Sequence, residues 1–367
     1  RDLAVTEGMA GQTVTAVGVF AVLTSLLLSP LTRGMDRRRI LLAFSLLLIR
    51  RRILLAFSLL LIVSNLLVAL APNYYVLLAG RGLLGICVGG FWSMAPAVTL
   101  QLVPAKDLPR ALSIVYAGVS VATILSLPLA SYLGHLLGWH NVFLLTSLLG
   151  GVMYAWQFAV IPPLPSRPGN SFSNMFALLR RNWVLAGMGG TIFSYGGYHV
   201  FFTYLRPFLE HDLALQPAAL SSVLLAFGIA NCLGTLAAGF VLGKWFRPTL
   251  FGVHLALAAV AILLFYVQNR PLNMILVMAW GFLFGFIPVS WSVWIARTLA
   301  DKAELAGGIS VAVTQFSIGL VAAVGGLTFD DFGISGIFLI AVTFLLAAAG
   351  LVRGSFTLYA KDREQLP

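Results

Sequence analysis

The sequence predicts an all-α fold, that of a polytopic membrane protein in which each helix crosses a lipid bilayer. It contains eleven apolar segments, each close to the about 20 residues that a helix needs to cross a hydrocarbon core. The composition agrees, because 60% of the residues are hydrophobic and only 10% are charged, which excludes a soluble globular domain. The predicted spans are 11–31, 53–71, 75–100, 111–136, 141–161, 184–208, 219–243, 248–268, 272–296, 305–328 and 333–356.

Basic residues gather in every second gap between the spans, which predicts the orientation of the chain. One face of the membrane holds 19 of the 23 lysines and arginines, and Arg81 lies inside a span. The other face holds only Arg1, Arg206 and Arg270. By the positive-inside rule the basic face is cytoplasmic, so the first residue is outside and the C-terminus is cytoplasmic. The net charge of +11 is spread over short loops, which favours contact with lipid headgroups over nucleic acid.

The longest polar linker in the interior, residues 162–183, divides the chain into two helical bundles and is expected to be cytoplasmic. Residues 1–161 form an N-terminal bundle of five spans, and 184–367 form a C-terminal bundle of six spans with a short cytoplasmic tail. Transporters built from parallel repeats commonly pair two similar bundles. We therefore expect one further helix before residue 1, so that this chain carries eleven of twelve, and we expect no coupled transport without that helix.

An identical tandem copy interrupts the N-terminal bundle. Residues 37–49 read RRRILLAFSLLLI, and residues 50–62 repeat them. One helix through both copies would place three arginines inside the bilayer, each at a cost of about 2.5–3.5 kcal/mol. Because 53–71 is long enough to span alone, we expect the second copy in the membrane and the first on the cytoplasmic side. The copy is interpreted as a sequence-assembly artefact, with a lipid-binding insertion as the alternative.

Several motifs resemble the major facilitator superfamily, in particular its drug:proton antiporter branch. They are MDRRRILL (35–42), GRGLLGICVGGFW (80–92) and LPLASYLGHLLGWHNVF (127–143). Two departures weaken the antiport assignment: Asp36 directly precedes Arg37, and no paired glycines follow Pro128. Three further stretches resemble the purine ribonucleoside exporters of this branch: LVPAKDLPRALSIVYAGVS (102–120), FFTYLRPFL (201–209) and IPVSWSVWIARTLADKAELAGGISVAVTQ (287–315).

The resemblance implies a proton-coupled antiporter of a bacterial inner membrane, yet no carboxylate lies within a predicted span. All twelve acidic residues fall in loops or at the ends. A proton-coupled exporter needs a titratable group that reaches both sides in turn. Either the acid lies on the helix expected before residue 1, as the resemblance implies, or a histidine such as His199 carries the proton.

Arg81 is the basic residue predicted to lie within the membrane, about 9 Å along its helix from the span start. Such a cation needs a partner or an aqueous cavity, unless it snorkels to the headgroups. The resemblance implies a role in proton coupling for Arg81, and a gating role for the basic loop with Asp36 and Arg37. One turn apart on the same helix, Gly85 and Gly89 predict a close approach of a neighbouring helix.

Aromatic and polar residues at helical spacing indicate a substrate site in the C-terminal bundle. Tyr195, Tyr198, His199 and Phe202 point one way on the span 184–208. Stacking of a purine between aromatic rings is worth about 1–3 kcal/mol per base. Two tryptophans are further candidates for substrate binding: Trp291, on a stripe with Trp280, and Trp92, eleven residues after Arg81. For His199, a packed and hydrogen-bonded histidine is the alternative.

Several classes of protein are unsupported by any motif. There is no G-x-x-x-x-G-K-[ST] loop for ATP, no H-E-x-x-H or paired C-x-x-C for a metal, and no G-x-S-x-G elbow. We therefore expect no enzyme, no cofactor and no metal. The sequence predicts a monomeric secondary exporter that exchanges a purine nucleoside for protons. A sugar or drug exporter of the same superfamily is one alternative, and a non-transporting receptor or scaffold is another.

Overall fold

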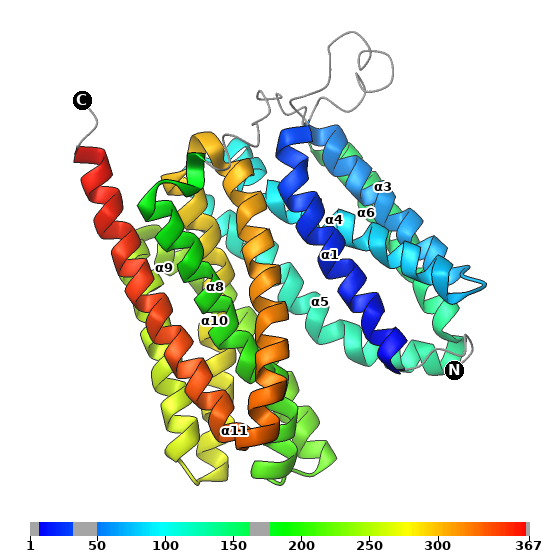
Figure 1. Cartoon of the computed structure of the whole chain (residues 1–367). Coiled ribbons are helices and arrows are strands. Elements are labelled where there is room, and N and C mark those ends of the chain that lie inside the picture. Colours follow the sequence, from blue (N-terminus) through cyan, green and yellow to red (C-terminus); the bar gives the residue numbers. More distant parts are fainter. Residues whose placement is uncertain (1–6, 32–49, 162–176, 365–367) are drawn as a thin grey trace. The chain divides into compact units, whose positions relative to one another are not determined.

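The computed structural model describes residues 7–31, 50–161 and 177–364, and every regular element in these ranges is helical (Figure 1). The all-α prediction is therefore confirmed. The main helices are α1 (Glu7–Leu31), α3 (Arg50–Ala69), α4 (Tyr74–Leu102), α5 (Leu108–Leu137), α6 (Trp139–Val160), α8 (Asn182–Pro207), α9 (Pro217–Tyr266), α10 (Arg270–Thr298) and α11 (Ala303–Glu364). Two short helices, η1 (Phe208–Asp212) and η2 (Ala300–Lys302), join neighbours.

Each of the two longest helices contains a break in its backbone. Trp245 in α9 has φ −117° and ψ 39°, and Gly333 in α11 has φ 60° and ψ −153°. The conformation at Gly333 is one that glycine adopts without a steric penalty. These breaks fall at or beside gaps between predicted spans, so α9 and α11 each correspond to two spans.

The helices are long and apolar enough for a multi-pass membrane protein. Among the described residues, seven have the length and composition to cross a bilayer, with α9 counted once. Shorter apolar helical stretches, Ala16–Leu27 and Leu54–Ala69, lie in α1 and α3. Large apolar side chains such as Phe240 (63%) and Leu339 (69%) are exposed. An apolar outer surface of this kind is stable in contact with lipid chains.

The helices form two compact units, which are described separately below. Among the described residues, unit 1 contains 7–31, 50–101, 126–161 and 301–312, and unit 2 contains 102–125, 177–300 and 313–364. The first part of α5 therefore belongs to unit 2, and the first part of α11 to unit 1. The predicted division at the linker 162–183 stays a prediction, because most of that linker lies outside the described residues.

In unit 1, α3 and α6 lie side by side (Figure 1). Polar side chains join them, since Ser58 Oγ donates to Gln157 Oε1 at 2.6 Å and Ser147 Oγ donates to the Ile62 carbonyl at 3.2 Å. The second tandem copy, residues 50–62, forms the first part of α3. The first copy, residues 37–49, lies outside the described residues, as do Asp36 and Arg37.

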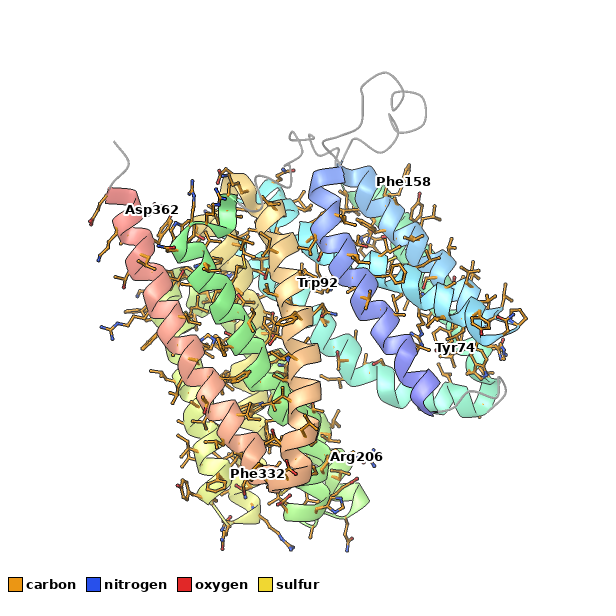
Figure 2. The ribbon with its side chains drawn as sticks, viewed as in Figure 1. Tyr74, Trp92, Phe158, Arg206, Phe332 and Asp362 are labelled. Atoms are coloured by element: carbon orange, nitrogen blue, oxygen red, sulfur yellow. The ribbon has the colours of Figure 1, made fainter. Side chains whose placement is uncertain are left out.

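In unit 2, the helix ends match the alternation predicted from charge. Figure 2 shows Arg206 and Phe332 at one end of this unit and Asp362 at the other. The start of α8 meets the end of α11, because Trp183 Nε1 donates to Asp362 Oδ2 at 2.9 Å. Arg206, predicted outside, and the C-terminal tail, predicted inside, therefore lie at opposite ends. Which end is cytoplasmic stays a prediction.

Candidate functional site

Four aromatic rings from three helices of unit 2 form a stack, called the aromatic ladder below. Its members are Phe227 of α9, Phe202 and Tyr198 of α8, and Phe284 of α10. Tyr198 lies on Phe284 with ring centroids 3.2 Å apart and planes 7° apart. On its other side Tyr198 is 5.4 Å from Phe202 at 18°, and Phe202 is 5.8 Å from Phe227 at 25°. The ladder exists because Tyr198 and Phe202 are one helical turn apart and share a face of α8.

The other predicted residues of α8 surround the same rings. His199 and Tyr195 present their rings edge-on to Phe284, at 5.8 Å and 6.2 Å. His199 Nδ1 donates to the Tyr195 carbonyl at 2.9 Å, because a carbonyl only accepts. This bond leaves Nε2 as the ring nitrogen that can face a ligand. The structure thus brings Tyr195, Tyr198, His199 and Phe202 together, while their role in substrate binding stays a prediction.

Sequence reasoning did not assign the ladder's partners from α9 and α10 to the site. Phe284 lies on the predicted stripe of α10, seven residues before Trp291, so the sequence pattern could have placed it in the site. No sequence pattern indicated Phe227. Trp280 lies 6.1 Å from Tyr198 with its plane tilted 16°, and its buried Nε1 has no hydrogen-bond partner among the described residues. An unpaired buried N–H costs free energy, and a water or a ligand acceptor would satisfy it.

A line of polar contacts joins the first part of α5 to α9 and α10. Tyr116 Oη lies 2.8 Å from Ser292 Oγ. Ser120 Oγ donates to Asn231 Oδ1 at 2.8 Å, and Asn231 Nδ2 donates to the Gly281 carbonyl at 3.1 Å. These bonds fix α5 against the helices that carry Phe227 and Phe284.

Trp291 occupies a second, buried position on α10. Its ring packs against Gly190 of α8, where a Cβ would lie 2.9 Å from the ring. Its Nε1 donates to Ser194 Oγ at 3.1 Å, and Ser194 Oγ lies 2.5 Å from His254 Nε2 of α9. Only 2% of Trp291 is exposed. Its predicted contact with substrate stays a prediction, and its polar contacts in this structure are to protein.

Unit 1 holds the remaining predicted residues, Arg81 and Trp92, both on α4. The guanidinium carbon of Arg81 lies 5.2 Å from the ring centroid of Phe143, while its buried Nε has no hydrogen-bond partner among the described residues. Trp92 contacts the neighbouring Phe91 edge-on at 5.2 Å. Gly85 and Gly89 meet the backbone of α1 directly, in agreement with the predicted close approach.

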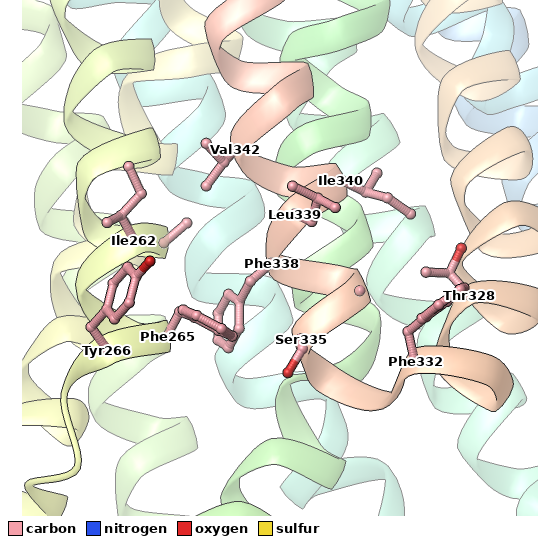
Figure 3. Close-up of a pocket in the computed structure, with 12 residues that line it drawn as sticks. Ile262, Phe265, Tyr266, Thr328, Phe332, Ser335, Phe338, Leu339, Ile340 and Val342 are labelled. Carbon is pink, nitrogen blue, oxygen red and sulfur yellow. The ribbon is translucent and has the colours of Figure 1, made fainter.

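An open apolar groove of about 570 Å³ lies between the second half of α9 and α11 (Figure 3). Its lining includes Tyr266, Phe332 and Leu339, which are 74%, 70% and 69% exposed. It contains no charged side chain, so a polar nucleoside would lose hydrogen bonds there. The ladder is the better candidate. Within the described residues, no group of three or more histidine, cysteine or acidic side chains is placed to hold a metal ion.

These features define a class: a multi-pass helical membrane protein with an aromatic ladder between the helices of one unit. A plan of two helical units is that of transporters built from repeated bundles. The family model of the Major Facilitator Superfamily matches residues 1–205 and 187–366. The chain belongs to the Major Facilitator Superfamily, which confirms the resemblance drawn from the motifs.

Relatives and solved structures agree with this family. The chain is 38% identical over 335 residues to the purine ribonucleoside efflux pump NepI of Salmonella paratyphi B, covering 91% of this chain and 81% of that protein. The same figures hold for the pump of Salmonella typhimurium strain LT2. The transporter FucP in its outward conformation matches with a TM-score of 0.75 at 13% identity, covering 96% and 91% of the two chains. The human organic anion transporter MFSD10 matches at 0.72 and 18% identity, covering 92% and 82%. These two structures support the fold alone.

Proposed function

We propose that this protein exports purine ribonucleosides across a bacterial inner membrane in exchange for protons, with its C-terminus in the cytoplasm. The relatives named as purine ribonucleoside efflux pumps support the substrate class. The aromatic ladder is the observation that carries the proposal, because it supplies flat apolar surfaces in unit 2 against which a purine base could pack. Basic residues in alternate gaps support the orientation.

The base would contact the ladder at Phe202, which lies between Tyr198 and Phe227. Phe202 is 42% exposed, whereas Tyr198 is only 3% exposed, so Phe202 is the member that a ligand reaches first. His199 Nε2 and the Tyr195 hydroxyl would form hydrogen bonds with the base or ribose. Stacking would supply affinity for any purine, and the hydrogen bonds would select the nucleoside.

We propose that Arg81 and His199 take part in proton coupling, and that Asp36 and Arg37 belong to a gating loop. The buried Nε of Arg81 has no partner in the described residues. A buried cation of this kind favours a nearby anion or water, and a carboxylate that alternates between Arg81 and a proton would couple proton movement to conformation. Trp92 and Trp291 complete the proposed set of substrate-binding residues. We expect the transporter to work as a monomer.

Transport by reconstituted protein tests this proposal. Proteoliposomes of the full-length protein with an imposed pH gradient should accumulate labelled inosine, and unlabelled guanosine should compete while xylose and a cationic drug should not. Accumulation inhibited by xylose or by the drug would favour a sugar or drug exporter. An absence of inosine binding and of inosine exchange in wild-type protein would remove the nucleoside assignment.

A further inference from the structure

Three polar side chains from three helices meet in the interior of unit 2, and two of them, Ser194 and His254, have no role assigned above. Ser194 of α8 and His254 of α9 are 0% exposed, and Trp291 of α10 is 2% exposed. We call these residues the Ser194–His254–Trp291 cluster. Within the described residues, the His254 nitrogens contact Ser194 Oγ at 2.5 Å and the Leu250 carbonyl at 2.6 Å. Its ring centroid lies 6.4 Å from that of Trp291.

The contacts fix where the hydrogens lie when His254 is neutral. The Leu250 carbonyl can only accept, so Nδ1 carries the ring hydrogen and Nε2 accepts. The Ser194 hydroxyl therefore donates to His254 Nε2. The Ser194 oxygen accepts from Trp291 Nε1 at 3.1 Å. In this arrangement the Gly190 carbonyl, 2.6 Å from Ser194 Oγ, receives no hydrogen from the hydroxyl.

The same positions also satisfy a protonated His254. A proton on Nε2 would turn that nitrogen into a donor to the Ser194 oxygen. The Ser194 hydroxyl then rotates and donates to the Gly190 carbonyl, while its oxygen still accepts from Trp291. Every donor has an acceptor in both states, so one hydroxyl rotation accommodates the proton. A cluster with only a packing role needs just one of these arrangements.

We propose that His254 is a proton-binding site whose occupancy sets the direction of the Ser194 hydroxyl and the strength of the Trp291 hydrogen bond. The claim that His254 binds a proton stands independently of the proposed function. The claim that this proton is coupled to transport rests on the proposed nucleoside–proton exchange. The ring of His254 faces Ser194 from α8, Trp291 from α10 and the Leu250 carbonyl from its own helix. Among the described residues, no acidic side chain forms an ion pair with it.

The cluster is placed to affect the aromatic ladder through two helices. Ser194 precedes Tyr198 by four residues on α8, and Phe284 precedes Trp291 by seven on α10. Both spacings put the paired residues on one helix face. A charge at His254 would strengthen or weaken the α8–α10 contact at the cluster, one to two turns from Tyr198 and Phe284. This site differs from His199, which edges the ladder itself.

The test is a nuclear magnetic resonance titration in lipid nanodiscs, with histidine rings and tryptophan indoles labelled with ¹⁵N. Variants His254→Gln and Trp291→Phe assign the two signals. Between about pH 8 and about pH 4, His254 should change from one protonated nitrogen to two. The Trp291 indole signal should shift with the same midpoint in the wild type, and Ser194→Ala should abolish that shift. His211→Gln is the matched control, because its loss should remove only its own signal.

Two results would overturn the inference: a His254 ring that stays neutral over the whole range, or a Trp291 signal that does not follow it. Addition of inosine separates this inference from the proposed function. If His254 and Trp291 titrate together but inosine moves no signal, the proton site stands and the nucleoside assignment fails. If inosine shifts the signals of α8 while His254 never titrates, the exporter assignment stands and the proton site is lost.

Discussion

The ring of Tyr198 lies parallel to that of Phe284, with centroids 3.2 Å apart and 7° between their planes. The two residues come from α8 and α10, and Phe202 extends the stack on the other side of Tyr198. Tyr198 also stacks with Trp280 of α10, with centroids 6.1 Å apart and planes 16° apart, and aromatic pairs at such separations are worth about 0.5–1.5 kcal/mol beyond the area that they bury. Tyr198 therefore holds two helices together and supports Phe202, the exposed member of the ladder.

Two replacements of Tyr198 separate the contribution of its ring to inosine binding from that of its hydroxyl. Tyr198→Ala should weaken inosine binding by about one order of magnitude, since it removes the ring that supports Phe202, where contact with a base would contribute about 1–3 kcal/mol. Tyr198→Phe should bind nearly as wild type, because it keeps the ring. Equilibrium binding to purified protein measures both. Tyr266→Ala, in the exposed apolar groove, is the matched control and should leave affinity unchanged. Equal affinity for Tyr198→Ala and wild type would place the base elsewhere.

Close packing of α9 on α10 makes a prediction about Gly234. A Cβ at this position would collide with the carbonyl of Phe282, which belongs to the backbone and cannot rotate away. Gly234→Ala should therefore destabilise the protein by about 1–3 kcal/mol, the usual cost of overpacking. Thermal unfolding in detergent measures the effect.

The control is Gly243→Ala on the same helix, where a Cβ would meet nothing within 4 Å. That change should be neutral or slightly stabilising, because alanine has the higher helix propensity. A similar fall in both variants would mean that the helix backbone, and not the α9–α10 contact, limits stability.

The length and charge of the spans predicted most of the fold, whereas contacts between helices were largely out of reach. About 20 apolar residues are needed for each crossing, so all eleven spans have helical counterparts. The backbone break at Trp245 falls in the gap that hydropathy leaves between the spans 219–243 and 248–268. Spacing on one helix placed Tyr195, Tyr198, His199 and Phe202 together. Phe227 and His254 contact residues of other helices. Those contacts depend on how the helices cross and how each is rotated about its axis, which the spacing along one helix does not define.

The contact between α5 and α9 predicts a measurable coupling between Ser120 and Asn231. Their side chains are joined at 2.8 Å, and hydrogen bonds between membrane helices contribute on average about 0.6 kcal/mol. Ser120→Ala and Asn231→Leu should each lower stability, and the double variant should lose less than the sum. A double-mutant cycle on unfolding free energies measures the difference. Strict additivity would show that the hydrogen bond contributes nothing in the membrane.

Arg81 should affect proton coupling more than substrate binding. Its buried Nε has no hydrogen-bond partner in the described residues, so its charge is available to a carboxylate that exchanges protons. Arg81→Gln should abolish inosine accumulation driven by a pH gradient and retain inosine exchange without a gradient. Both rates are measured in the same proteoliposomes.

The matched control is Arg206→Gln, since the Arg206 side chain is 71% exposed and pairs with Glu210, four residues further along the chain. Exposed pairs contribute little, so this change should leave both rates intact. Loss of gradient-driven accumulation and exchange together in Arg81→Gln would instead assign Arg81 to the conformational change or to folding, and retention of both would exclude it from coupling.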